Sequence, residues 1–543
     1  MPIESRWTTP LPEVSLPTWI FGSSTAPLPF LKAFMDADRP DDNFVTFEEY
    51  RLLSKRLAVG LQRAGLSPGD RALLSAGNSI HFPCIFMGIV MAGGIFTGAS
   101  PLFGPRELAY QLTDSGAKFL IVHKPGLATA LEAADTAGLA RSHIYVFDGV
   151  KKPDVYEQLN GAKHWTELLA DATETEQFQW FEPGNPKETT CCLNYSSGTT
   201  GSPKGVEITH FSYVANGEAC VHHESSDPSR KGRGPTTGLC FLPMYHAAGQ
   251  TTYIANSPKM GYQTAVMSQY NLEAVLRHIQ TFKISTLSVA PVLVLQLSKS
   301  PLTANHDLSS IQEIMSGTAP LSPEVAAELE KIVWPKGENF IRQGWGMTEI
   351  TCAGLMWAFD DKEKSSSVGE AIANSRIMIR DGDKEVTEPN KPGELWFSGP
   401  TLMKTYWRNP KAYQETVVID KDGTRWMKTG DVACVDRYEP GAKVYLVDRM
   451  KELIKVRGFQ VAPSELEGVL LERKDITDAG VVGVQLNGEE VPRAFRVAKY
   501  KQLRGGVVFV ESIPRTLVSF IPPRASPRFP PQLGRNAGPK RGN

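Results

Sequence analysis

Hydrophobic and polar positions alternate between two spacings along the first half of the chain. Between Glu48 and Ala64, four large apolar residues recur at the spacing of one helix face. Elsewhere the apolar residues form short continuous runs, such as KFLIVH from Lys118 to His123, which are typical of strands buried on both faces. The alternation of such runs with helical stretches predicts parallel sheets covered by helices.

The same patterns predict the individual elements. Before residue 150 they predict helices over 48–64, 80–91, 106–115 and 126–140, and strands over 70–76, 94–99, 118–123 and 143–147. Between residues 205 and 343 they predict strands over 205–209, 239–243, 284–290, 311–316 and 339–343, with helices over 272–282, 292–298 and 323–332. A further helix is expected to begin near His210, with Thr209 as its N-terminal cap.

Short β segments with turns replace this rhythm beyond Ser365, at 376–380, 393–397 and 444–447. The expected fold is α/β, with a large N-terminal domain of parallel sheets layered with helices and a small β subdomain, over residues 1–447. We expect a small, mobile and truncated α+β domain over 448–517. The proline-rich basic tail over 518–543 is expected to be disordered.

Charge and cysteine content limit the expected partners and compartment. Lys and Arg number 58 against 59 Asp and Glu, which gives no general attraction for nucleic acid or membranes. The seven cysteines form no CxxC pair, as expected for reduced thiols inside a cell. The most apolar run, 84–99, is broken by two glycines and is too short to span a bilayer. Because neither a secretory apolar core nor a peroxisomal address can be recognised, we expect a cytoplasmic protein. We expect it to be a monomer or a homodimer.

One stretch has the composition of a phosphate-binding loop. From Tyr195 to Gly205 the chain reads YSSGTTGSPKG, between two strand-like runs. Glycines let the backbone approach a ligand closely, hydroxyls and backbone N–H groups solvate anionic oxygens, and Lys204 adds a mobile charge. The loop is not a Walker A motif, because Pro203 precedes the lysine and Gly205 follows it. A Ser/Gly-rich turn without function is the alternative.

Three later strands end in loops that carry glycine or histidine. These loops are MYHAAG from Met244, GTAP from Gly317 and GWGMTE from Gly344. Ligands of open α/β sheets bind beyond the carboxyl ends of the strands. The convergence of the three loops therefore favours a nucleotide site over an isolated phosphate site.

Taken together, YSSGTTGSPKG, QGWGMTE over 343–349 and KTGD over 428–431 resemble the adenylate-forming acyl-CoA synthetase superfamily of AMP-binding enzymes. DRMKELIKVRGFQVAPSELE, over 448–467, looks like the hinge region of its coumarate–CoA ligase-like branch. The resemblance extends from about residue 45 to 483. It implies that a carboxylate attacks the α-phosphate of ATP in the presence of Mg²⁺, and that coenzyme A then displaces AMP from the acyl-adenylate.

The resemblance also implies roles for individual residues. Lys204, His246, Thr348, Glu349 and Lys455 would act in catalysis, with Thr200 and Glu349 near Mg²⁺. Asp431 would accept hydrogen bonds from the ribose after a tight Thr-Gly turn. The remaining ATP and AMP contacts would come from Ser196, Ser197, Gly198, Thr199, Thr200, Gly201, Lys204, Thr318, Gln343, Gly344, Thr348, Arg449, Lys451 and Gln460.

The acyl group would enter at His246, which would orient the carboxylate or gate the pocket and would not act as a general base. The pocket would be lined by Tyr245, His246, Ala248, Thr252, Gly344, Cys352 and Ala353, whose mostly small side chains leave room for an aryl or medium-chain acid. Arg457 and Gly458 would border the coenzyme A channel. Structural roles are the alternatives: a helix cap for Glu349, a strand-end histidine for His246 and a solvated basic segment for the lysines.

The chain departs from the family pattern in its C-terminal domain. After Phe495 we expect a strand–helix unit of roughly 25 residues to be absent. IPRT over 513–516 begins the family's terminal motif but continues as LVSF, so the adenylation lysine has no counterpart. The pattern resembles a miscalled exon boundary or an altered reading frame more than gradual divergence. The departure predicts strongly impaired adenylation and an exposed edge in the small domain.

The leading hypothesis is an ATP-dependent acyl-CoA ligase for an aryl or medium-chain carboxylic acid. A second hypothesis is an adenylating enzyme that passes the acyl group to a carrier protein or an amine. A third is a nucleotide-binding remnant without turnover. Arg457, Gly458 and the run KYKQLRGG over 499–506 favour coenzyme A as the acceptor.

Overall fold

The computed structural model describes most of the first 450 residues and parts of the C-terminal region. The described residues are 2–149, 159–196, 203–228, 235–358, 360–361, 363–450, 452–456, 459–471, 476, 479–486, 489–496 and 507–509. The predicted disordered tail, 518–543, and the expected break at 513–516 lie outside them.

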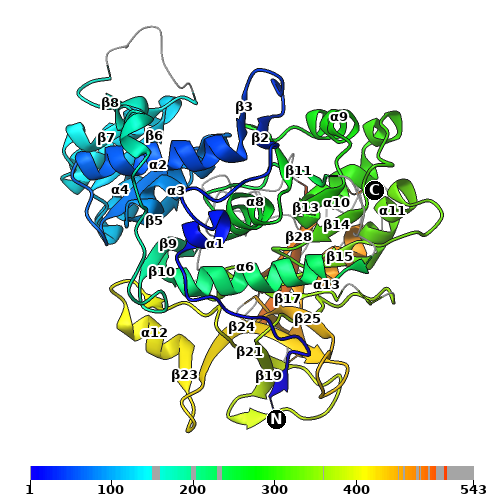
Figure 1. Ribbon diagram of the computed structural model, residues 1–543. Helices are drawn as coiled ribbons and strands as arrows, with labels where there is room; N and C mark the ends of the chain where they lie inside the picture. The colour runs from blue at the N-terminus through cyan, green and yellow to red at the C-terminus, as the bar shows by residue number, and fades with distance from the viewer. Residues whose placement is uncertain are drawn as a thin grey trace, which may run out of the picture.

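Eight strands form the first sheet, in the order β22-β10-β9-β5-β4-β6-β7-β8 (Figure 1). The run from β9 to β8 is parallel, whereas β10 pairs antiparallel with both β9 and β22. The bounds are β4 Arg71–Ser75, β5 Ile95–Ala99, β6 Phe119–His123, β7 Ile144–Phe147, β8 Lys163–His164, β9 Thr190–Ser196, β10 Lys204–Thr209 and β22 Thr405–Tyr406.

A second sheet has the order β15-β14-β13-β11-β12-β2-β3 and is parallel except for β3. Its strands are β2 Lys32–Asp36, β3 Phe44–Thr46, β11 Thr237–Cys240, β12 Gln263–Val266, β13 Thr286–Val289, β14 Glu313–Ser316 and β15 Arg342–Gln343. The prediction of parallel sheets layered with helices is confirmed, although β2 and β12 were missed.

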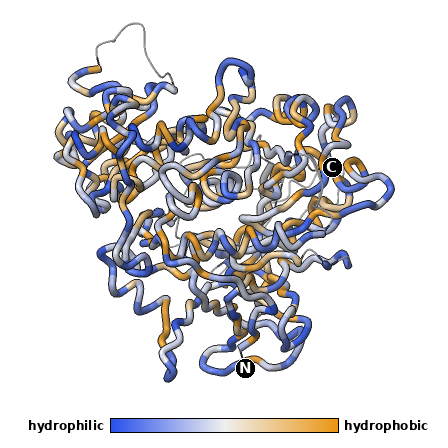
Figure 2. Tube along the Cα trace, viewed as in Figure 1, coloured by the Kyte–Doolittle hydropathy of each residue, from blue (hydrophilic) through white to orange (hydrophobic). Residues whose placement is uncertain are grey.

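The helices begin where the sequence supplies caps. Thr46 and Glu49 form a capping box for α2, Phe47–Arg63, and the Thr209 hydroxyl accepts from Ser212 N at the start of α6, His210–Ser225. The other long helices are α3 Phe82–Met91, α4 Pro105–Ser115, α5 Leu127–Ala137, α9 Leu272–Phe282, α10 Pro291–Lys299 and α11 Pro323–Val333. Apolar positions gather in this interior, whereas the loop between β2 and β3 is hydrophilic (Figure 2). Within the described chain no helix is long and apolar enough to cross a membrane.

The expected small β subdomain is an antiparallel sheet at the lower end of Figure 1. Its strands are β1 Ile3–Glu4, β19 Arg376–Asp381, β20 Lys384–Glu385, β21 Gly393–Ser398, β23 Val417–Ile419, β24 Arg425–Val435 and β25 Val444–Arg449. The predicted Thr-Gly turn is wrong: Thr429 and Gly430 lie inside β24, where the register shifts against β21 and Gly430 takes a φ of 73°. Thr429 and Gly430 form a β-bulge instead, which re-aims the next side chain.

The C-terminal part contains the hairpin β26 Ile454–Val456 and β27 Phe459–Val461, the helix α13 Pro463–Leu471, and a second small sheet. In that sheet β28 Ala479–Leu486 pairs antiparallel with β29 Glu489–Arg496, and β30 Val507–Phe509 pairs parallel with β29. Residues 497–506, which join β29 to β30, lie outside the described chain, so the expected loss of a strand–helix unit stays a prediction. Asp448 and Arg449 belong to β25, two residues past the expected domain boundary.

Candidate active site

The predicted phosphate loop joins two paired antiparallel strands, β9 and β10. Ser196 ends β9 and faces Lys204, the first residue of β10, in the strand register. The phenol of Tyr110 donates to the Pro203 carbonyl at 2.8 Å and ties the base of the loop to α4. The predicted loop residues Ser197, Gly198, Thr199, Thr200 and Gly201 lie outside the described residues.

Tyr406 joins Lys204 to Glu349. It lies in β22, where it pairs with Val206 of β10, and the Lys204 Nζ stands 5.0 Å from the centroid of its ring. Its hydroxyl donates to Glu349 Oε1 at 2.9 Å, and burial raises the pKa of the phenol well above its ordinary value. Three segments that are far apart in the sequence therefore meet at one tyrosine.

Glu349 is a buried carboxylate held in place by the backbone as well. It is 7% exposed and lies in the short turn Thr348–Ile350, next to half-buried Thr348. Its carbonyl accepts from Met403 N at 2.8 Å. A Cβ on Gly346 would lie 1.9 Å from the Cys352 carbonyl, so the loop closes tightly only with glycine there. The described residues contain no group of three or more His, Cys, Asp or Glu that could hold a metal ion.

Asp431 forms the second polar centre and is not isolated. Trp345 Nε1 donates to its Oδ2 at 2.7 Å, and Arg449 Nε lies 3.0 Å from its Oδ1. Arg449 faces Asp431 across the β24–β25 pair, and its side chain is 47% exposed against 6% for the carboxylate. Burial raises the pKa of Asp431, whereas the charge of Arg449 and the Trp345 hydrogen bond lower it. The site therefore holds a desolvated acceptor that faces two donors.

The loops after β14 and β15, which were expected to contact ATP, lie side by side. Gly344 N donates to the Ser316 carbonyl at 2.8 Å, and Gln343 Oε1 accepts from Leu321 N at 2.9 Å. Exposed Thr318, just after β14, has a φ of 76°. A β-branched residue in the left-handed region is strained, and such strain gathers at ligand sites.

His246 and the residues after it lie in the segment that follows β11. His246 is half-buried, its ring centroid lies 4.7 Å from that of Tyr245, and burial lowers its pKa to about 4. Half-buried Ala248 and Thr252 follow it, the latter within a π-helical turn, Gln250–Asn256, that the sequence did not predict. Cys352 and Ala353 are also half-buried, and burial raises the pKa of the Cys352 thiol. Gly249 packs its α-carbon against the Pro243 carbonyl, which a Cβ would approach to 2.2 Å.

The predicted C-terminal contacts are described in part. Lys451, Arg457 and Gly458 lie outside the described residues. Lys455 and Gln460 face each other in the β26–β27 hairpin. Their predicted contacts with nucleotide stay predictions.

Sequence reasoning missed three residues that hold the site together: Tyr406, Trp345 and Thr351. Trp345 lies inside the recognised QGWGMTE motif, so its role could have been suspected. Thr351, 1% exposed with a φ of 72°, donates from its hydroxyl to the Thr401 carbonyl at 2.8 Å. Nothing near Tyr406 in the sequence indicates its partners, because they lie about 60 and 200 residues away.

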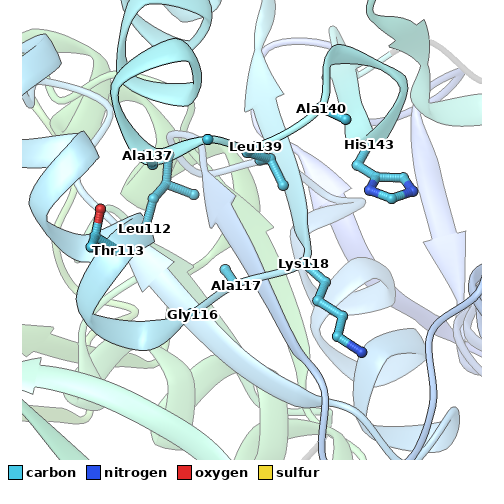
Figure 3. A pocket seen from close by; sticks show the side chains of 10 residues that line it. Leu112, Thr113, Gly116, Ala117, Lys118, Ala137, Leu139, Ala140 and His143 are labelled. Carbon is cyan, nitrogen blue, oxygen red and sulfur yellow. The ribbon is translucent and has the colours of Figure 1, made fainter.

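A cavity of about 380 Å³ lies at the amino ends of β6 and β7 in the first sheet (Figure 3). It is lined by the ends of α4 and α5 and by residues before β6 and β7, including Lys118 and His143. Lys118 is paired with Asp70 at 2.8 Å. Because the cavity lies at the amino ends of these strands and contains none of the predicted site residues, it is separate from the candidate active site.

The comparisons with known proteins agree with this geometry. Residues 29–407 match the family model of the AMP-binding enzyme. The chain is 32% identical over 530 residues to the acyl-CoA ligase azaF of Aspergillus niger, with 93% of this chain and 96% of that protein covered. It is 34% identical over 512 residues to a 4-coumarate–CoA ligase of Pinus taeda, covering 88% and 90%. The fold matches ATP-bound MatB from Rhodopseudomonas palustris with a TM-score of 0.76 at 21% identity, over 92% and 96% of the two chains.

Proposed function

Because this chain belongs to the AMP-binding enzyme family, we propose that it is an ATP-dependent acyl-CoA ligase. It activates an aryl or medium-chain carboxylic acid as an acyl-adenylate and transfers the acyl group to coenzyme A. The resemblance to acyl-CoA ligases, stated from three motifs, is confirmed over most of the chain.

One observation carries the assignment of the site. The Lys204 ammonium lies over the ring of Tyr406, and the hydroxyl of the same side chain donates to the carboxylate of Glu349. A lysine at the base of a glycine-rich hairpin and a buried carboxylate are the two charges that a metal–triphosphate requires. We propose that Lys204 binds the β- and γ-phosphates, together with Ser196 and the loop 197–201, and that Thr348 contacts the α-phosphate.

Mg²⁺ fits this site only as a metal shared with substrate. The buried carboxylate of Glu349 is joined to the phosphate hairpin through Tyr406, and Mg²⁺ is usually bound by one or two carboxylates plus phosphate oxygens and waters. We propose that Glu349 and Thr200 hold the ion, whose charge would neutralise the departing pyrophosphate.

The second polar centre suits the ribose and adenine of ATP. The Asp431 carboxylate can exchange its Arg449 contact for ribose hydroxyls, because the exposed guanidinium can turn to water or to the nucleotide. We propose that Thr318, Gln343 and Gly344 line the adenine. Lys451 and Gln460 would join them from the C-terminal part.

In the first step a carboxylate oxygen of the acid attacks the α-phosphorus of ATP, and the bond to the bridging oxygen breaks to release pyrophosphate. Such a reaction depends on positioning and charge neutralisation. His246 is neutral near pH 7, because its pKa is about 4, so its ring can orient the carboxylate by hydrogen bonding. A carboxylate needs no deprotonation at this pH, which removes any requirement for a general base.

In the second step the thiol of coenzyme A loses its proton to solvent, its sulfur attacks the acyl carbon, and the bond from that carbon to the phosphate oxygen breaks to release AMP. We propose that Lys455 approaches the adenylate and that Arg457 and Gly458 border the thiol channel after the C-terminal domain rotates. The acyl group would lie among Tyr245, His246, Ala248, Thr252, Gly344, Cys352 and Ala353. Half-buried small side chains at Ala248 and Ala353 leave room for an aromatic ring. The Pinus taeda relative is a ligase of such an aryl acid.

Release of AMP with and without coenzyme A separates this proposal from its competitor. A ligase requires the thiol for sustained AMP release, whereas an enzyme that passes the acyl group to an amine or a carrier protein turns over without coenzyme A when that acceptor is supplied. A cytoplasmic location and a monomeric or homodimeric state complete the hypothesis. Fractionation and light scattering of the full chain would test them.

A further inference from the structure

A buried pair of amides connects the two halves of the site. Asn194 Nδ2 donates to Gln250 Oε1 at 3.0 Å, and Gln250 Nε2 donates back to Asn194 Oδ1 at 2.9 Å. The side chains are 4% and 0% exposed. Each amide therefore uses a donor and an acceptor on the other, in surroundings where an unmade hydrogen bond is costly.

The two residues belong to segments with different expected tasks. Asn194 lies in β9, two residues before Ser196 at the base of the phosphate hairpin. Gln250 opens the π-helical turn that follows His246, and its backbone N donates to the His246 carbonyl at 2.9 Å. Single π-helical turns inside helical segments occur frequently at functional sites.

A third hydrogen bond fixes the orientation of the pair. Gln250 Nε2 also donates to the Tyr245 carbonyl at 3.1 Å. Turning the Gln250 amide over would bring two carbonyl oxygens together, so the carbonyl of Tyr245 decides which way both amides point. The backbone that carries Tyr245 and His246 is thus joined through Gln250 to the strand that leads into the phosphate hairpin.

We propose that Asn194 and Gln250 are positioning residues that fix the acyl-binding segment against the phosphate hairpin, so that the carboxylate meets the α-phosphate at the correct distance. The inference rests on the proposed function of the two segments. Neither side chain touches a reacting atom. Misplacement of reacting groups by about 1 Å can lower a rate roughly 100-fold, so a pair of this kind affects kcat.

The test uses the full chain and an exchange of the two side chains. The single variants Asn194→Gln and Gln250→Asn each change the distance between the amides by one methylene. The double variant N194Q/Q250N restores the total length and can re-form the pair. We expect each single variant to lower kcat of carboxylate-dependent ATP–pyrophosphate exchange by about tenfold or more, with the KM for ATP within about twofold, and the double variant to recover most of the loss.

Thr303→Val is the matched control. Thr303 is 1% exposed, and its hydroxyl donates to the Leu297 carbonyl at 2.7 Å, far along the chain from either segment. We expect the control to lower the thermal midpoint while leaving kcat unchanged. Equal losses in all single variants and the control, or no recovery in the double variant, would overturn the inference.

Amide hydrogen exchange decides the coupling without any turnover. Asn194→Ala should raise exchange in peptides that cover Tyr245–Gln250 by about fivefold or more, because it removes both amide hydrogen bonds that join Asn194 to Gln250. Unchanged exchange there would contradict the inference even in an active enzyme. If the wild-type chain shows no pyrophosphate exchange with any acid, the proposed function fails, and the hydrogen-exchange result still stands for or against the pair.

Discussion

The phenol of Tyr406 donates a 2.9 Å hydrogen bond to the buried carboxylate of Glu349. The same ring lies under the Lys204 ammonium, so a single side chain sets the distance between two opposite charges. This relationship turns a glycine-rich loop and a conspicuous Thr-Glu pair into one candidate site, and it supplies the first prediction.

Tyr406→Phe keeps the ring and removes the donor to Glu349. We expect the Mg²⁺ concentration for half-maximal pyrophosphate exchange to rise about tenfold or more, because a hydrogen bond to a charged group contributes about 1.5–3 kcal/mol and orients it. Titration with Mg²⁺ at saturating ATP measures the effect. Tyr262→Phe is the control. The Tyr262 phenol donates to Glu224 at 3.1 Å, and neither residue belongs to the hairpin. An equal Mg²⁺ dependence in both variants would contradict the role of Tyr406.

Lys204→Met should weaken the binding of ATP but not that of AMP. If Lys204 binds the β- and γ-phosphates, removal of its charge weakens ATP about tenfold or more, equivalent to about 1.4 kcal/mol, and leaves AMP within about twofold. Calorimetric titration with each nucleotide gives the two affinities. A parallel loss for both would place the lysine elsewhere.

Asp431→Asn should weaken the binding of ATP and AMP equally. The carboxylate is proposed to accept from the ribose, which ATP and AMP share, so both affinities should fall by a similar factor of about ten. The neutral side chain also loses its ion pair with Arg449, but the guanidinium is 47% exposed and can be hydrated, so we expect a small change in stability. Selective loss of ATP binding would contradict this assignment.

The free energy of unfolding should decrease as the pH falls, because the chain buries a neutral histidine, His210, outside the site. His210 is 2% exposed, its Nδ1 accepts from Leu16 N at 3.1 Å, and burial lowers its pKa to about 4. Between about pH 6.5 and 4 the unfolded chain binds a proton that the folded chain refuses, so stability decreases as the pH falls. Above pH 6.5 the contribution is constant.

Urea unfolding at pH 7 and pH 5 tests this expectation. His210→Asn retains an acceptor for Leu16 N and should reduce the loss of stability between the two pH values by about 2 kcal/mol. His306→Asn, at a more exposed histidine beside the Leu302 carbonyl, should leave the loss unchanged. If both variants keep the wild-type dependence, His210 is not the group responsible.

Locally encoded features were predictable from the sequence. The helix over 272–282 was placed residue for residue, because Asn271 caps it and its apolar stripe is regular. The parallel strands were found as apolar runs between helices. β12 was missed because its four residues, QTAV, contain too few large apolar side chains to stand out.

The features that escaped prediction depend on contacts between distant segments. β22 has only two residues, and its value lies in pairing with β10, about 200 residues earlier. The bulge at Gly430 looks like a turn in the sequence, because glycine at positive φ serves both. The π-helical turn carries the polar and apolar residues of an ordinary helix, so its pattern does not distinguish the two.

Carboxylate-dependent exchange of labelled pyrophosphate into ATP by the full 543-residue chain tests the central claim most directly. We expect exchange above background with an aryl or medium-chain acid, at a low rate because the terminal adenylation lysine has no counterpart in the sequence. Omission of the acid should abolish the signal. Tight ATP binding without acid-dependent exchange, across a panel of such acids, would contradict the ligase assignment and identify the chain as a nucleotide-binding remnant.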